Sequence, residues 1–246
     1  MDGTFEGADR ISGEAMTEQI LIGRGGCYAC PVRCKRVVKA AEPYEVDPYY
    51  GGPEYETMGA FGSLCGVGDL VAVAKANELC NKYGMDTIST GVTIAFSMEC
   101  YEKGVLTKAD TGGLDLHFGN AHAMVSAVEL IARREGIGDL LAEGVMRASR
   151  ALGKGSEGWA LHVKGQELAL HEPRGKHGVG LSYALASTGP DHMEAAHDPV
   201  LAQRTPPLAR AAPLGILDPV PAMDLSSRKV RQFLYLQQLW SMYNSL

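Results

Sequence analysis

The chain has 246 residues, a net charge of −6 and an ordinary globular composition, with 46% hydrophobic and 21% charged residues. This length suits one large domain or two smaller ones. The acidic balance argues against nucleic acid or an anionic membrane as the main partner, because both require a basic face. No apolar run approaches the ~18 residues of a membrane span, and residues 1–6 show no secretory signal. Six cysteines without an export signal predict a cytoplasmic protein whose clustered thiols bind metal.

The first 24 residues predict a short lead-in followed by one helix. Ser12 is a suitable N-cap, and Met16, Ile20 and Leu21 would share one helical face. Glycines at positions 23, 25 and 26 then break the helix and open a cysteine-rich loop.

That loop has the densest set of soft ligands in the chain, C-x2-C-x3-C, formed by Cys27, Cys30 and Cys34. Zinc sites usually pair two ligand couples, and no second couple stands at a zinc-like spacing. Iron–sulfur clusters commonly use three close cysteines and one remote cysteine. We therefore expect a [4Fe-4S] cluster, with zinc as the second and inert cysteines as the third interpretation. Candidates for the fourth ligand are Cys65, Cys80 and Cys100, of which the last two lie in apolar helical stretches where buried, inert cysteine is the commoner outcome.

Residues 35–53 are polar and then rich in proline and tyrosine, which predicts an irregular excursion or a short hairpin. Glu54 and Glu56 follow, between prolines and glycines on one side and an apolar stretch on the other. Surface carboxylates are common, but this placement would partly desolvate both groups and raise their pKa values.

From residue 69 to 152 the pattern is helical, with short joints marked by glycine. Asp69 is expected to cap a first helix that ends at Gly84, and Asp86 would ordinarily cap a second, buried helix from Ile88 to about residue 103. After a loop over residues 105–119, helices are expected over about 120–135 and 139–152, the latter capped by Asp139. Because sustained alternation of period two is nearly absent, the fold class is all-α.

After Trp159 the regular helical pattern gives way to turns and histidines, so we divide the chain into residues 1–160 and 161–246. A turn at residues 172–175 and a short helix at about 179–187 lead to His192, which follows a Gly-Pro turn and by itself is more often structural than catalytic. Prolines make residues 198–221 mostly irregular. A last helix follows residues 224–227 and reaches the final residue without a C-cap glycine, which predicts that the chain stops within an element. Its expected apolar face is Val230, Phe233, Leu234, Leu236, Gln237 and Trp240.

Five segments stand in a specific order and spacing: Cys27-x2-Cys30-x3-Cys34, Gly52-Pro53-Glu54-Tyr55-Glu56, the stretch from Tyr83 to Gly91, Pro173-Arg174-Gly175, and Gly189-Pro190-Asp191-His192. Together they resemble the aldehyde:ferredoxin oxidoreductase family, whose members are tungsten enzymes with a bis-pterin cofactor. The resemblance covers nearly the whole chain, and it rests on the combination of segments, since the cysteine triplet alone is not specific.

The resemblance implies two helical domains, the second incomplete, which in the family follow a β-rich domain that holds much of the pterin. It makes Cys27, Cys30 and Cys34 three ligands of a [4Fe-4S] cluster whose fourth cysteine, after a Gly-Leu, would lie beyond Leu246. The family's pterin-binding motif D-x-x-G-L-D reads here from Asn81 through Gly84 and Met85 to Asp86, with Asn in place of the first Asp. A second such motif would begin at Asn244.

By the same resemblance, Glu56 and His192 match the glutamate and histidine beside the metal, which is tungsten or molybdenum. The implied reaction is oxidation of a small aldehyde to a carboxylic acid, with ferredoxin or another acceptor taking the electrons. Family members that bridge two subunits through iron use a Glu and a His where this chain has Lys75 and Val125, so no bridging metal is expected and a homodimer is left open.

Two further hypotheses compete with this one. A non-catalytic electron-transfer module would use the cysteine triplet for an iron–sulfur cluster or zinc alone. A related family member would act on another substrate, such as an aromatic acyl thioester, because a fold does not fix a reaction. On its own, the 246-residue stretch is expected to be catalytically inert.

Overall fold

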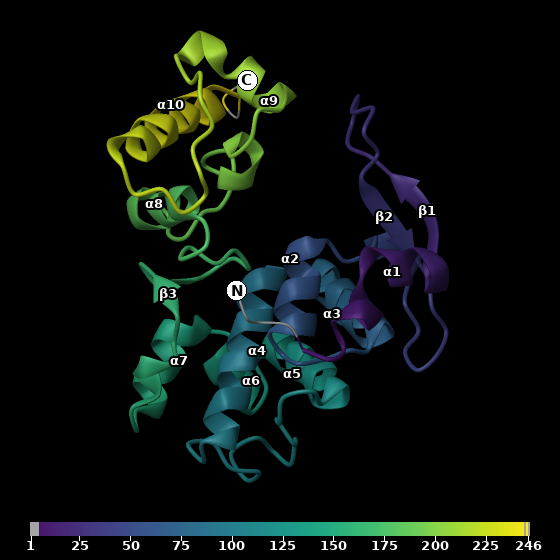
Figure 1. The fold of residues 1–246 in the computed structure, drawn as a ribbon. Helices are drawn as coiled ribbons and strands as arrows, with labels where there is room; N and C mark the ends of the chain where they lie inside the picture. The colour runs from purple at the N-terminus through teal and green to yellow at the C-terminus, as the bar shows by residue number, and fades with distance from the viewer. Residues whose placement is uncertain (1–4, 244, 246) are drawn as a thin grey trace. The chain divides into compact units, whose positions relative to one another are not determined.

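The computed structural model describes residues 5–243 and 245, and the chain divides into two compact units, Asp2–Leu161 and His162–Leu246. Each unit is helical, as predicted. The strands in the described residues form two small antiparallel pairs, β1 with β2 in the first unit and β3 with β4 in the second (Figure 1). Among the described helices, none combines the length and the apolar character that crossing a bilayer requires.

The first unit is built around helices whose caps follow the sequence signals. Asp69 accepts a hydrogen bond from the backbone N–H of Ala72 (3.0 Å), and Asn120 accepts one from Ala123 (3.1 Å), so both helices begin where a polar side chain can satisfy an open N–H group. Gly84 ends the first of them in the left-handed conformation. The helices are α1 (Gly13–Gln19), α2 (Tyr55–Thr57), α3 (Leu70–Tyr83), α4 (Thr87–Glu102), α5 (Ala121–Arg133), α6 (Ile137–Leu141) and α7 (Gly144–Leu152).

The prediction of one helix capped by Asp139 is wrong. The segment forms two short helices, α6 and α7, and Asp139 lies inside the first turn of α6, where it pairs with Arg134 (3.0 Å). Gly138 explains why α6 starts early: a Cβ there would lie 2.2 Å from the carbonyl of Leu130, so only glycine lets α6 pack this closely on α5. The positive φ of 78° at Gly144 then separates α6 from α7.

The N-terminal helix is also shorter than predicted. It ends at Gln19, and Leu21 instead begins strand β1 (Leu21–Gly25), which pairs with β2 (Lys35–Val38). Ile20 and Val38 are both buried in a cluster with Leu70, so the apolar residues at the end of the helix serve the hairpin as well as the helix. The cysteine loop is the turn of this hairpin, and it extends away from the helices (Figure 1).

The second unit is organised by a buried ion pair. Lys229 donates to Asp198, both almost fully buried, and Asp198 also accepts hydrogen bonds from the backbone N–H groups of Gly178 (3.0 Å) and Val179 (3.1 Å) at the start of α8. The carboxylate therefore caps one helix and binds the last one. The elements are β3 (His162–Val163), β4 (Gln166–Glu167), α8 (His177–Leu185), α9 (Pro206–Arg210) and α10 (Ser227–Tyr243).

This ion pair also corrects the predicted face of the last helix. Phe233 and Leu236 are buried as expected, but Val230 and Leu234 are 56% and 49% exposed. Lys229 and Gln232 occupy the buried face instead, because Asp198 requires its countercharge there. Apolar periodicity could not anticipate a buried lysine.

Candidate functional site

The three cysteines of the triplet are exposed on the loop that joins β1 to β2. The backbone N–H of Cys30 donates to the carbonyl of Cys27 (3.1 Å), which makes a tight turn. Ala29 and Arg33, the residues before the second and third cysteines, have positive φ values of 56° and 49°. This left-handed conformation costs a non-glycine residue about 1–2 kcal/mol, and such strain concentrates at ligand-binding loops.

The other cysteines lie in the core of the first unit. Burial raises the pKa of the Cys65 and Cys80 thiols to about 12 and that of Cys100 to about 11. These groups stay protonated at neutral pH, whereas a metal ligand must be a thiolate. The expectation that Cys80 and Cys100 are buried is confirmed, and that all three are inert stays a prediction.

Glu56 lies on α2, directly before a π-helical turn over Met58–Ser63. The turn packs closely on α4, since a Cβ at Gly91 would lie 2.6 Å from the Cβ of Ala60. Thr57 is linked to Thr87 at the start of α4 by a hydrogen bond between their hydroxyl groups (2.9 Å). π-Helical turns are rare and frequent at functional sites, so Glu56 is a half-buried carboxylate on an unusual and well-held backbone.

Its neighbour Glu54 behaves differently. The expectation that Glu54 is desolvated is wrong, because its side chain is 55% exposed and pairs with Arg36 on β2 (2.5 Å). The two carboxylates are therefore distinct in environment although they are two residues apart.

The predicted pterin-binding motif forms the joint between α3 and α4. Asp86 accepts hydrogen bonds from the backbone N–H of Ile88 (2.7 Å) and the hydroxyl of Ser89 (3.3 Å), so its ordinary role as an N-cap is confirmed. Two oxygens can accept about four hydrogen bonds, which leaves acceptor capacity for a ligand. Asp86 and Met85 line a pocket of about 360 Å³ together with Ser89, Thr90 and Thr93.

Gly84 and Asn81 hold this joint in place. The backbone of Gly84 has the left-handed helical conformation, and the side-chain amide of Asn81 donates to the carbonyl of Tyr50 (3.0 Å). An aspartate could not donate this bond, so the Asn in place of the family's Asp has a structural use here. Asn244, the predicted start of a second motif, lies outside the described residues.

His192 belongs to the second unit, whereas Glu56 belongs to the first, and each is described within its own unit. The loop that carries His192 is held from two sides. The hydroxyl of Ser182 on α8 donates to the carbonyl of Asp191 (2.6 Å), and the Nε2–H of His197 points to the carbonyl of His192 (2.9 Å). Because a carbonyl only accepts, His197 must carry its proton on Nε2.

The sequence did not reveal that His192 stands in a group of imidazoles. The rings of His171 and His192 have centroids 5.0 Å apart, and His171 and His197 meet edge to face at 4.4 Å. Lys176 donates to Nδ1 of His171 (3.0 Å), which leaves Nε2 as the protonated nitrogen of a neutral His171. Burial is the first cause that lowers the pKa of His197, and the second is the positive charge that His171 carries whenever it is protonated. The only sequence signal was the density of histidines after residue 160.

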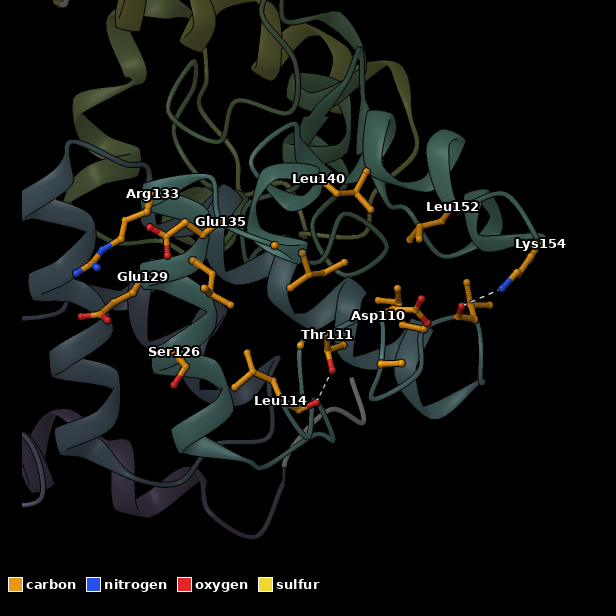
Figure 2. A pocket seen from close by; sticks show the side chains of 17 residues that line it. Asp110, Thr111, Leu114, Ser126, Glu129, Arg133, Glu135, Leu140, Leu152 and Lys154 are labelled. Carbon is orange, nitrogen blue, oxygen red and sulfur yellow. Dashed lines mark hydrogen bonds between the residues drawn. The ribbon is translucent and has the colours of Figure 1, made fainter.

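A groove of about 750 Å³ in the first unit contains none of these residues. It lies between α5, α6 and the loop over residues 105–119, with Leu114 and Leu140 on its walls and Glu129, Arg133 and Glu135 at one end (Figure 2). Thr111 and Lys154 hold the loop through hydrogen bonds to the carbonyls of Leu114 (2.6 Å) and Val105 (3.2 Å). The volume of a groove therefore does not by itself identify where the predicted catalytic and cofactor-binding residues lie.

The helical fold and these segments can be compared with those of known proteins. The family described as "Aldehyde ferredoxin oxidoreductase, domains 2 & 3" matches residues 1–246, so the chain belongs to this family. A tungsten-containing aldehyde ferredoxin oxidoreductase of Pyrococcus abyssi is 42% identical over 195 residues, which are 78% of this chain and 31% of that protein. The chain thus spans less than a third of the length of this relative.

Two other relatives show how widely the fold is used. The aliphatic sulfonate oxidoreductase WOR-like subunit of Pyrococcus furiosus is 33% identical over 179 residues, 69% of this chain and 28% of that protein. The active-site complex BamBC of benzoyl coenzyme A reductase, solved with 1,5-dienoyl-CoA, has a TM-score of 0.61 at 24% identity over 74% of this chain and 27% of that one. The latter likeness concerns the fold alone.

Proposed function

We propose that this chain is the helical, cluster-bearing part of a tungstopterin oxidoreductase that oxidises aldehydes to carboxylic acids. The observation that carries the proposal is the 42% identity to a tungsten-containing aldehyde ferredoxin oxidoreductase over 78% of the chain. The reaction converts an aldehyde and water into a carboxylic acid, two protons and two electrons. A bound tungstopterin would supply the two-electron redox chemistry, and a [4Fe-4S] cluster would pass the electrons singly to ferredoxin or another acceptor.

The residues present fit these groups. Exposed thiols on a strained loop suit a cluster that bonds Cys27, Cys30 and Cys34 together. The pocket at Met85 and Asp86 offers a carboxylate with unused acceptor capacity, which suits the N–H groups of a pterin ring.

In the proposed mechanism Glu56 is the general base and His192 is the hydrogen-bond donor. Glu56 takes a proton from the water that attacks the aldehyde carbon, and its half-buried position favours proton uptake over that of a fully solvated carboxylate. His192 donates to the carbonyl oxygen as negative charge develops there. The hydrogen bonds from Ser182 and His197 fix the His192 backbone, which preorganises the donor.

The test compares two glutamates in the natural protein that contains this chain. Glu56→Gln removes the base but keeps the shape, and we expect loss of aldehyde-dependent dye reduction by a factor of roughly 10²–10⁴. Glu54→Gln, which removes only an exposed carboxylate, should retain activity. Full activity in Glu56→Gln at unchanged tungsten content would refute the assignment. Turnover of a sulfonate without any aldehyde oxidation would favour a function like that named for the Pyrococcus furiosus relative.

A further inference from the structure

Lys176 occupies a helix position that does not favour a lysine. It is the N-cap residue of α8. A lysine has no acceptor with which to cap the first N–H groups of a helix, and its charge is repelled by the positive end of the helix dipole. Asp198 caps α8 instead, through the backbone N–H groups of Gly178 and Val179. Helix formation therefore does not account for a lysine at this position.

The side chain of Lys176 is directed to an imidazole. Its Nζ donates to Nδ1 of His171 (3.0 Å), so the proton of a neutral His171 is on Nε2. A second proton on this ring would displace the hydrogen bond and place two positive charges side by side. The ammonium group thus holds His171 as a neutral imidazole whose second nitrogen is a donor.

Other residues of the same unit fix the backbone and the ring of His171. The hydroxyl of Tyr183, a buried residue of α8, lies within hydrogen-bond distance of the carbonyls of Ala169 (3.3 Å) and His171 (3.2 Å). The ring of His197 meets the ring of His171 edge to face. His171 is therefore held at its carbonyl, at its ring face and at Nδ1 by neighbours within the second unit.

The direction of these hydrogen bonds has a consequence for His192. The rings of His171 and His192 have centroids 5.0 Å apart and planes inclined by 39°, which lets facing nitrogens approach hydrogen-bond distance. Because Nδ1 of His171 accepts from Lys176, a hydrogen bond between the two rings can only run from His171 to His192. His192 then accepts on the nitrogen that faces His171, and its own proton is on the other nitrogen.

We propose that Lys176 and His171 are positioning residues that direct the proton of His192 to the substrate. The proposal rests on the proposed function, in which His192 donates to the carbonyl oxygen of the aldehyde. The three side chains form a relay in which each donates to the next, and hydrogen bonds in such a chain polarise and strengthen one another. Lys176 also prevents His171 from accepting the proton that His192 donates to the substrate. Within the relay no bond to hydrogen is broken.

The tautomer of His171 tests this without relying on activity. In the natural protein with isotope-labelled histidine, the chemical shift of the ring carbon Cδ2 distinguishes the two neutral tautomers, and His171→Gln identifies the signal. We expect the Nε2-protonated form in the wild type and a mixture of both forms in Lys176→Met. Lys176→Arg, which retains a charged donor, should restore the wild-type signal. Lys164→Met is the matched control, because Lys164 of the same unit donates to a backbone carbonyl, that of Ala186.

Steady-state kinetics gives the second measurement. In Lys176→Met we expect kcat and kcat/KM for aldehyde oxidation to fall together by roughly 10–100-fold, because the support of a group that acts in the transition state is lost. Lys176→Arg should recover most of this loss, and Lys164→Met should turn over like the wild type.

Several outcomes would overturn the proposal. They are an Nδ1-protonated or doubly protonated His171 in the wild type, an unchanged signal or an unchanged kcat in Lys176→Met, and an equal loss of turnover in Lys164→Met. The wild-type signal needs no substitution at position 176, so it decides the tautomer even where a variant does not fold. The expected signals in a protein that has no aldehyde activity would instead retain the positioning pair and reject the proposed function.

Discussion

The cysteine loop and the loop that carries His192 differ in how the protein holds them. Around His192, side chains from neighbouring segments hold the backbone by hydrogen bonds. The hydroxyl of Ser182 donates to the carbonyl of Asp191, and the ring of His197 donates to the carbonyl of His192. The cysteine loop has less support: a short turn, and a hydrogen bond from Arg33 to the carbonyl of Arg24. It also contains two residues in the strained left-handed conformation, and its thiols are exposed. The fold preorganises the first loop, whereas the second has strained backbone that the proposed cluster would compensate.

The largest predicted effect concerns the support of the His192 loop. Lys229→Met leaves Asp198 buried without its countercharge, so we expect the free energy of unfolding of the second unit to fall by about 3–5 kcal/mol. Hydrogen exchange of the amides of α8 and α10 measures the change. Arg228→Met, on the exposed side of the same helix, should cost much less. Equal protection in both variants would show that the ion pair does not organise this unit.

The next prediction concerns the pH dependence of the stability of the second unit, which contains the His192 loop. Since burial lowers the pKa of His197, the unfolded chain binds a proton at this site before the folded one does as the pH falls below the ordinary value of ~6.5. The second unit should therefore lose stability below that pH and regain it above. His197→Gln, which still offers a donor to the carbonyl of His192, should reduce this dependence.

Urea midpoints at pH 7.5 and 5.5 check the prediction, with His122→Gln, an exposed histidine on α5, as the control. The same loss of stability at low pH in wild type and His197→Gln would exclude His197 as its source.

Much of the helical fold could be predicted from local signals. Asp69 and Gly84 mark helix ends by chemistry that acts over three or four residues, and both have the expected roles. The helix expected from about residue 120 begins there, with Asn120 as its N-cap. The errors lie where distant contacts decide. The start of α6 depends on the contact of Gly138 with Leu130, and the face of α10 depends on Asp198, 31 residues before Lys229.

The candidate site divides in the same way. The cysteine triplet is contiguous in sequence, so its loop could be recognised without the fold. The surroundings of His192 could not, because His171, Lys176 and Ser182 come together with it only through the folding of residues 162–198. Likewise, the spacing of Glu54 and Glu56 did not reveal that one is exposed and paired with Arg36 while the other is half-buried.

The smallest predicted effect lies in the cysteine loop. Ala29→Gly removes the strain of the left-handed backbone at this position, which stabilises the folded state by about 1 kcal/mol. Glycine also increases the conformational entropy of the unfolded chain, which lowers stability by about the same amount. We expect a change in unfolding free energy of less than about 1 kcal/mol and full cluster assembly. A large loss of stability in chemical denaturation would show that the fold, and not the bound group, depends on the shape of this loop.

The central claim is that the triplet holds an iron–sulfur cluster within a tungsten enzyme, and metal analysis of the natural protein tests it most directly. We expect iron, sulfide and tungsten to copurify, with iron lost from Cys30→Ser but retained in Cys100→Ala, whose wild-type thiol is buried. Zinc alone, bound at Cys27, Cys30 and Cys34 without iron or tungsten, would contradict the account.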